Sequence, residues 1–163
     1  MNIFVLDVDP RTSAQMMCDK HVVKMVLETA QMMCTVVSSF GYETPYRPTH
    51  AKHPCTLWAA GSYSNWRWLA AHGLALCEEY THRYNKKHKS ERVIRWCLEQ
   101  SIHFPQAALT PFAQAMPDKY RNPSAVTAYR TYYQNEKAAF ATWKTSPPPW
   151  WPEKGGFLAG AVT

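Results

Sequence analysis

Between Thr12 and Ser38 the chain reads TSAQMMCDKHVVKMVLETAQMMCTVVS, and this stretch decides the fold. Its apolar residues recur at the spacing of an α-helix. The pair Asp9-Pro10, just before it, has the residue types of a helix N-cap and first turn. Beyond it, residues 41–48 contain one glycine and two prolines, which end a helix. The sequence therefore predicts one long helix over 12–38 that is surrounded on most sides.

Three further helices are expected towards the C-terminus. The second runs from residue 55 or 56 to 84, with Gly61 and Gly73 as weak points, and a basic run follows it. The third spans 91–101. The fourth is capped by Asn122, carries a proline at its first position, and runs to 143.

These elements predict an all-α protein with a single domain over residues 1–163. We expect about four helices, a short extended segment over 2–8, and long loops rich in proline and aromatic residues. The tail, 146–163, begins SPPPWWP and is expected to be loosely held.

Length and composition restrict the class of protein. A chain of 163 residues is about one ordinary domain, and 46% hydrophobic residues are enough to build a core. The net charge of +6 favours a polyanionic partner, with nucleic acid first. Five widely spaced cysteines argue against a disulfide framework, and no apolar run is long enough for a signal peptide or a membrane span. We therefore expect a soluble, cytoplasmic protein without a membrane partner.

Polar side chains form a narrow strip on the helix expected over 12–38. On a helical wheel Lys24, Glu28 and Gln31 lie within about 80° of His21. One interpretation is a solvent edge in which Lys24 and Glu28 form an ordinary ion pair. The other is the floor of a cleft, where a carboxylate, an imidazole and an amine are enough for acid-base work on a leaving group.

Four stretches resemble, in the same order, the phage endonuclease V-type pyrimidine dimer DNA glycosylases. They are Asp19-Lys20-His21 with Glu28, Pro48-Thr49 with His53-Pro54-Cys55-Thr56, Met116-Pro117-Asp118-Lys119-Tyr120, and Tyr129-Arg130-Thr131-Tyr132-Tyr133 with Lys137. The resemblance covers about half of the chain. It implies a small all-α DNA-repair enzyme, encoded by a phage, that cuts the N-glycosidic bond at a pyrimidine lesion and cleaves the strand by a lyase step.

The resemblance also implies roles for particular residues. Glu28 would be the catalytic carboxylate and His21 a neighbour that contacts DNA. We expect Lys24, from the same polar strip, to help His21 position the phosphate or base. Such enzymes bend duplex DNA and flip a nucleotide, which requires basic and aromatic contacts to offset the cost. The residues expected to contact DNA, chiefly its phosphates, are Arg47, His50, Lys52, His53, Lys119, Arg121 and Arg130.

Two positions depart from the family pattern. The nucleophile there is the α-amine exposed when the first methionine is removed, but Asn2 is larger than the residues that normally follow a removed methionine. An arginine precedes the catalytic glutamate there, where this chain has Leu27. The segment before the histidine of the motif, here called the leader, is also about five residues longer than in the family. This would put the α-amine in a different place and leave Lys24 as the amine near Glu28. A lyase step, a monofunctional N-glycosidase and a changed substrate all stay open.

The sequence also bears on other function classes. Cys18 and His21, together with a cluster of His50, His53 and Cys55, have the residue types of a zinc site, but no familiar zinc module is present. We expect no metal and no cofactor, and the chain has no P-loop or dinucleotide fingerprint. The alternatives to a DNA glycosylase are an N-glycosidase for a free nucleotide or modified nucleoside, and a non-catalytic phage nucleic-acid-binding module.

Overall fold

Helices make up all the regular structure of residues 1–153, the part of the chain that the computed structural model describes. Within this part the order is α1 (Pro10–Met16), α2 (Asp19–Ser39), α3 (Pro54–Gly61), α4 (Tyr63–Tyr84), α5 (Glu91–Leu98), the short 3-10 helix η1 (Asp118–Tyr120) and α6 (Ala125–Glu136). The all-α prediction is confirmed. The number of helices is not, because each of the two longest predicted helices is divided.

The first division separates α1 from α2. Asp9 caps α1, as predicted, by accepting a hydrogen bond from the backbone N–H of Thr12 at 2.8 Å. The backbone then becomes extended at Met17 and Cys18 before α2 begins. The prediction of one continuous helix over 12–38 is therefore wrong.

Residues that are distant in the sequence stabilise this break. The buried guanidinium group of Arg83 donates hydrogen bonds to the backbone carbonyls of Gln15 and Met17, at 3.0 and 2.7 Å. The phenolic oxygen of Tyr133 accepts one from the backbone N–H of Cys18 at 3.1 Å. Backbone groups that a continuous helix would pair internally are thus paired through tertiary contacts.

The second division falls between α3 and α4, at one of the predicted weak points. Gly61 ends α3, and Ser62 is fully extended, with φ −159° and ψ 160°. The side chain of Ser62 accepts a hydrogen bond from the backbone N–H of Asn65 at 3.0 Å and so caps α4. The predicted single helix over 55–84 is therefore two helices.

The last two α-helices are shorter than predicted. The helix expected over 91–101 ends at Leu98, as α5. The helix expected over 122–143 is α6, which spans only 125–136, and its cap is Ser124 in place of Asn122. Both segments go on as irregular chain that packs against the core.

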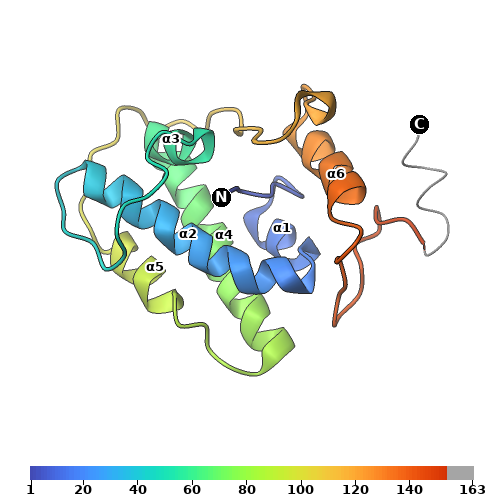
Figure 1. Cartoon of the computed structure of the whole chain (residues 1–163). Helices are drawn as coiled ribbons and strands as arrows, with labels where there is room; N and C mark the ends of the chain where they lie inside the picture. Colours follow the sequence, from blue (N-terminus) through green and yellow to red (C-terminus); the bar gives the residue numbers. More distant parts are fainter. Residues whose placement is uncertain (154–163) are drawn as a thin grey trace.

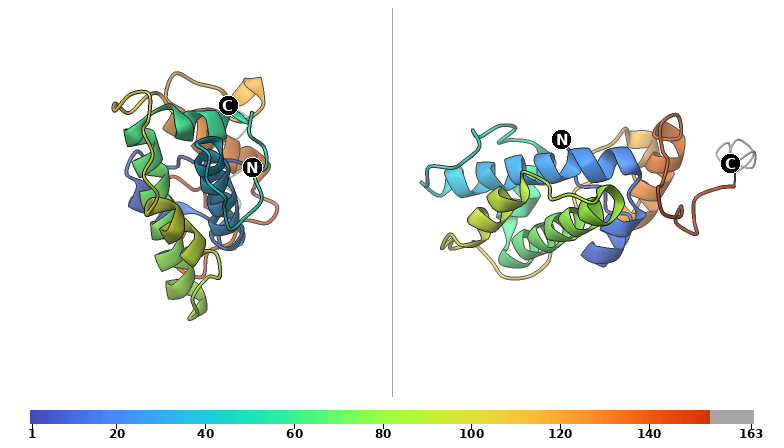
Figure 2. Two further views of the ribbon diagram at one scale, coloured as in Figure 1. Left: turned by 90° about the vertical axis from the view of Figure 1, so that its left-hand side faces the viewer. Right: turned by 90° about the horizontal axis from the view of Figure 1, so that it is seen from below.

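Helix α2 lies at the centre of the molecule and packs against α3, α4 and α5 (Figure 1). α4 packs against α2 and crosses it at an angle (Figure 1), and Figure 2 shows α6 at one end of the molecule. Close approach of α2 and α4 depends on Gly73, because a Cβ atom there would lie 2.8 Å from Cγ2 of Thr29. The weak point predicted at Gly73 is thus a packing contact.

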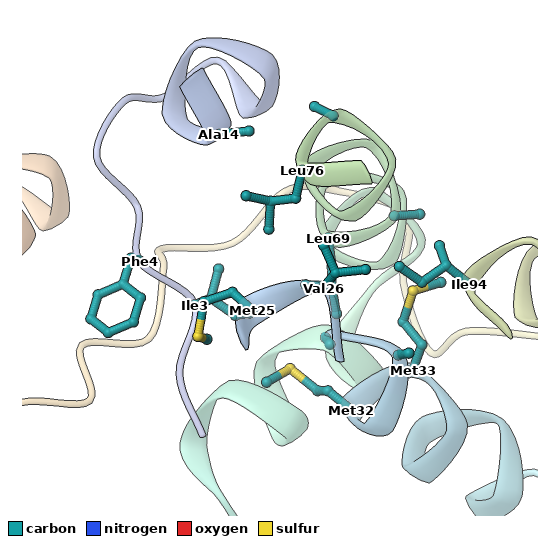
Figure 3. Packing of buried hydrophobic residues seen from close by; sticks show 14 of the residues in the cluster. Ile3, Phe4, Ala14, Met25, Val26, Met32, Met33, Leu69, Leu76 and Ile94 are labelled. Atoms are coloured by element: carbon teal, nitrogen blue, oxygen red, sulfur yellow. The ribbon is translucent and has the colours of Figure 1, made fainter. Parts of the chain in front are cut away.

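The N-terminal segment runs into the core as irregular chain. Ile3, Phe4, Val5 and Leu6 are all buried, and Ser13 ties the segment to α1 through bonds to the backbone of Phe4 and Leu6. Figure 3 shows Ile3 and Phe4 on opposite sides of the segment. This burial places the first residue of the chain beside α2 (Figure 1).

The chain after α6 folds back over it. Trp150 and Trp151 each lie 6.2 Å from the buried ring of Tyr133, measured between ring centroids. Part of the tail predicted to be loosely held is thus packed, and its remainder, 154–163, lies outside the described residues. Among the helices of residues 1–153, none has the length and apolar character needed to cross a membrane.

Candidate active site

A small cavity opens where the N-terminal segment and α6 meet α2. Its volume is about 150 Å³. The lining residues are Met1, Asn2, Phe4, His21, Lys24, Met25, Glu28, Tyr132 and Lys137. The three residues predicted from the polar strip, His21, Lys24 and Glu28, therefore line one hollow in place of a flat solvent edge.

Glu28 lies in this cavity between two cationic groups. Glu28 is only 9% exposed, because α2 is packed on most sides. One carboxylate oxygen, Oε1, lies 3.2 Å from the α-amino nitrogen of Met1. The other, Oε2, lies 3.6 Å from Nζ of Lys24, one helical turn away. A carboxylate and two amines of different kinds thus meet in one place.

The longer leader does not carry the amine away from Glu28. The buried run Ile3 to Leu6 passes beside α2 and brings Met1 back to the middle of that helix. The side chain of Met1 is 2% exposed, and the hydroxyl of Thr56 on α3 donates to its sulfur at 3.8 Å. Apolar burial of the leader therefore places the amine at the carboxylate.

His21 is a buried, neutral imidazole at physiological pH. Its ring stacks on Phe4, with centroids 4.5 Å apart, and Nδ1 lies 2.7 Å from the hydroxyl of Tyr133. Burial lowers the pKa of His21 to about 3, and the charges of Lys137, Lys24 and Lys20 act in the same direction. The other ring nitrogen, Nε2, makes no hydrogen bond with residues 1–153 and remains for a ligand.

Two lysines lie over aromatic rings: Lys137, which lines the cavity, and Lys20, which precedes His21 in the sequence. Nζ of Lys137 lies 4.9 Å from the ring centroid of Tyr132 and 5.8 Å from that of Phe4. Nζ of Lys20 lies 4.7 Å from the ring of Phe140. These separations are in the range of cation–π contacts, and those of Lys137 hold its ammonium group at the cavity.

The loop before α3 supplies further cations beside the same stretch of α2. Arg47 lines an open groove of about 540 Å³ together with Leu27, which stands where the family pattern has an arginine. His50 and Lys52 are exposed, and His50 has a left-handed backbone with φ 53°. Of the predicted rim residues in this loop, Arg47 therefore lines a groove beside α2, whereas His50 and Lys52 are exposed to solvent.

His53, in the same loop, caps α3 and responds to two charged groups of the cavity. Its Nδ1 accepts a hydrogen bond from the backbone N–H of Cys55 at 3.1 Å and so caps α3. Partial burial lowers the pKa of His53, the Met1 amine and His50 lower it further, and Glu28 opposes them. The imidazole thus has a structural partner and also lies in the electrostatic field of the amine and carboxylate.

The three cations predicted from the C-terminal third differ in their surroundings. Lys119 and Arg121 are exposed on and after η1; Lys119 lies over the ring of Tyr120, 5.1 Å from its centroid, and Arg121 pairs with Asp118 at 3.6 Å. Arg130 is half-buried and donates through Nε to the backbone carbonyl of Leu6 at 2.8 Å. Arg130 therefore holds the N-terminal segment, whereas the other two face solvent.

The cysteines and histidines that have the residue types of a zinc site do not form one cluster. Cys18 accepts a hydrogen bond from Tyr133 at 3.2 Å, and Cys55 donates to Asn2. Within residues 1–153 no group of three or more histidine, cysteine or acidic side chains is arranged to hold a metal ion.

Six lining residues were not predicted from the sequence as site residues: Met1, Asn2, Phe4, Met25, Tyr132 and Lys137. The pattern Tyr129-Arg130-Thr131-Tyr132-Tyr133 with Lys137 had marked the right segment. Its spacing carried no information on which of its members face α2.

The N-terminal half of the chain can be compared with known families. A model of the pyrimidine dimer DNA glycosylases matches residues 1–92, more than half of the chain. The chain belongs to this family. The matched part includes Met1, His21 and Glu28, whereas Tyr132 and Lys137 lie beyond it. Comparisons with curated proteins and with solved structures found no match.

Membership gives the coarse function. Proteins of this family are DNA glycosylases that act in DNA repair, so the substrate class is DNA. The family resemblance is confirmed at this level, and of the four stretches that suggested it, the two within residues 1–92 lie in the matched part.

Proposed function

We propose that this protein is a DNA N-glycosylase for damaged or modified pyrimidines in duplex DNA and that it also cleaves the strand by a lyase step. One observation carries the proposal. The α-amine of Met1 and the carboxylate of Glu28 lie 3.2 Å apart in a hollow beside cationic and aromatic side chains. That pair supplies a nucleophile and a proton acceptor within reach of one sugar.

In the glycosidic step the unprotonated amine attacks C1′ of the deoxyribose. A nitrogen–carbon bond forms while the C1′–base bond breaks, and its electron pair leaves with the base, which takes up a proton. The Glu28 carboxylate stabilises the positive charge that develops on the sugar. As a class, α-amines lose their proton at lower pH than lysines, which favours Met1 over Lys24 as the nucleophile.

The lyase step follows from the same bond. Nitrogen loses a proton, its electron pair forms the imine with C1′, and the C1′–O4′ bond opens with a proton added to O4′. A carboxylate can then take a proton from C2′, and the 3′-phosphate leaves by β-elimination. Water hydrolyses the imine and frees the amine. In this scheme Glu28 is the proton acceptor, and Lys24 and neutral His21 position the sugar and its phosphate.

The size of the cavity favours DNA over a free nucleotide. Pockets that enclose a small ligand usually measure about 300–1,000 Å³, whereas this one measures about 150 Å³. It can admit a sugar, with the rest of the substrate outside. Arg47 in the open groove, and Lys24 and Lys137 in the cavity lining, provide cations there for flanking phosphates.

The test is nicking of ultraviolet-irradiated supercoiled plasmid, with unirradiated plasmid as the control. We expect nicks only in irradiated DNA, and a covalent protein–DNA adduct when borohydride is added, because only an imine is reduced to a stable bond. Base release without an adduct would remove the lyase step. No release and no nicking, with binding retained, would instead indicate a non-catalytic module.

Binding measurements separate the duplex from a free nucleotide as substrate. The affinity for lesion-containing duplex should fall steeply with salt, because each neutralised phosphate releases counterions. Cleavage of a free modified nucleoside, with weak and salt-insensitive duplex binding, would favour the alternative.

A further inference from the structure

The side chain of Met1 is built into the site. The thioether is 2% exposed and contacts the hydroxyl of Thr56 on α3. The first residues of most domains are poorly ordered unless they are tied down. Here burial of the side chain ties down the α-amine of the same residue, 3.2 Å from Glu28.

Asn2 is held separately, and just as firmly. Its Oδ1 accepts hydrogen bonds from the hydroxyl of Tyr129 at 2.9 Å and from the backbone N–H of Ile3 at 2.8 Å. Its Nδ2 donates to the backbone carbonyl of Ala115 at 2.8 Å. Contacts from α6 and from the loop before η1 therefore fix the second residue in place.

These two anchors determine which residue can present an amine to Glu28. Neighbouring Cα atoms are 3.8 Å apart along the chain. If the chain began at Asn2, its amine would lie about one residue farther along, and the Asn2 side chain would hold it there. The gap left by the Met1 side chain would also open the wall of the cavity.

We propose that the reactive amine belongs to Met1 itself and that the buried Met1 side chain is the positioning group for it. This rests on the proposed function, and it departs from the resemblance, in which the amine appears after the first methionine is removed. The working protein keeps Met1. Asn2 is the residue that is larger than those that normally follow a removed methionine. Its side-chain hydrogen bonds hold the chain so that the amine of Met1 stays beside the carboxylate of Glu28.

The experiment compares chains with defined first residues, released from a cleavable N-terminal fusion. One form begins at Met1, a second begins at Asn2, and a third carries an added glycine before Met1. The substrate is a duplex with one abasic site, and the readout is the rate of borohydride trapping. We expect the Met1 form to trap and the other two to lose about 100-fold or more, because a displacement of about 1 Å already costs that much.

The added-glycine form keeps every side chain, so it guards against a folding defect in the shorter form. Thermal melting and duplex binding of this form should match those of the Met1 form. The Met1→Leu variant should recover most of the trapping rate, whereas Met1→Gly should not, because only leucine refills the buried site. Peptide mass analysis of the trapped complex should locate the adduct on residue 1.

The outcomes separate this inference from the proposed function. Equal trapping by the form beginning at Asn2, or an intact mass without Met1 for protein made without the fusion, would overturn the inference and leave the lyase step standing. No trapping by any form would overturn the lyase step itself. Trapping on Lys24 in place of residue 1 would reject Met1 and retain imine chemistry.

Discussion

Two carboxylates of α2 meet a cation from elsewhere in the chain, and their surroundings differ. Asp19 pairs with Arg83 at 3.1 Å, and the side chain of Arg83 is 0% exposed. That guanidinium group also bonds Glu79 and the carbonyls of Gln15 and Met17. Glu28 pairs with the amine of Met1 at a cavity.

The difference separates a structural ion pair from a candidate catalytic one. The guanidinium of Arg83 is closed in by partners, so it stabilises the break between α1 and α2 and has little capacity left for a ligand. The pair of Glu28 and Met1 faces a hollow of about 150 Å³. Burial and charge pairing alone do not distinguish the two, whereas access to a cavity does.

The largest effect is expected at the open pair, the ion pair of Glu28 and Met1 that faces the cavity. Glu28→Gln removes the proton acceptor and keeps the shape, so cleavage of lesion-containing duplex should fall by about 10²–10⁴-fold. Duplex binding and thermal melting should stay close to those of the unmodified chain. The measurement is single-turnover cleavage, and an unchanged rate would remove Glu28 from the mechanism.

For the closed pair, the buried ion pair of Asp19 and Arg83, we expect substitution to lower the stability of the fold. Arg83→Met leaves Asp19, Glu79 and the carbonyls at the helix break without their partner, and we expect a loss of about 3–5 kcal/mol in the free energy of unfolding. Urea denaturation measures it. If the variant melts like the original chain, the contrast between the two ion pairs is wrong.

The pH dependence of stability tests the imidazole beside the open pair. The pKa of His21 is about 3 in the folded protein, against 6.5 for an unperturbed histidine. The unfolded chain therefore binds more protons between these values, so the stability from His21 is complete above pH 6.5 and is lost as the pH falls towards 3.

The slope is about 1.4 kcal/mol per pH unit, or about 2 kcal/mol between pH 6.5 and 5. His72, whose pKa burial lowers to about 4, adds its own slope. The His21→Phe variant should keep the part from His72 and lose the part from His21 in urea denaturation at each pH. Equal slopes for the variant and the original chain would show that His21 is not buried as a neutral imidazole.

The smallest effect is expected at the mouth of the cavity. Lys137→Gln should weaken binding to duplex several-fold and reduce the salt slope by about 1, because one phosphate contact is lost. Lys144→Gln is a matched control, since Lys144 lies over Tyr84 and does not line the cavity. Gel shifts at several salt concentrations measure both, and identical salt slopes would exclude Lys137 from the interface.

The sequence predicted the local features of the site well. Helical periodicity placed His21, Lys24 and Glu28 on one face, because residues three, four and seven apart share a face of any α-helix. Caps were predicted where the signal is local, as at Asp9. The breaks after Met16 and Gly61 were harder to foresee, because partners from distant segments or a single extended residue decide them.

The amine illustrates the limit most clearly. The greater length of the leader suggested that the α-amine would lie away from Glu28. A count of residues gives the length of this segment but not the path that it takes through the fold. In the folded chain Ile3 to Leu6 are buried, and the path that this burial dictates returns Met1 to Glu28. Lys137 also comes from a distant segment of the chain. Its ammonium group lies over the ring of Phe4 in the leader, and its charge lowers the pKa of His21.

By itself the sequence determined the helical class, the polar strip on α2 and the family resemblance, because each depends on residue types at short, regular spacing. Only the tertiary structure decided that this strip lines a hollow, that an amine from residue 1 meets the carboxylate there, and that Arg130 supports the leader. Those outcomes depend on burial and pairing between distant segments, which no local spacing encodes.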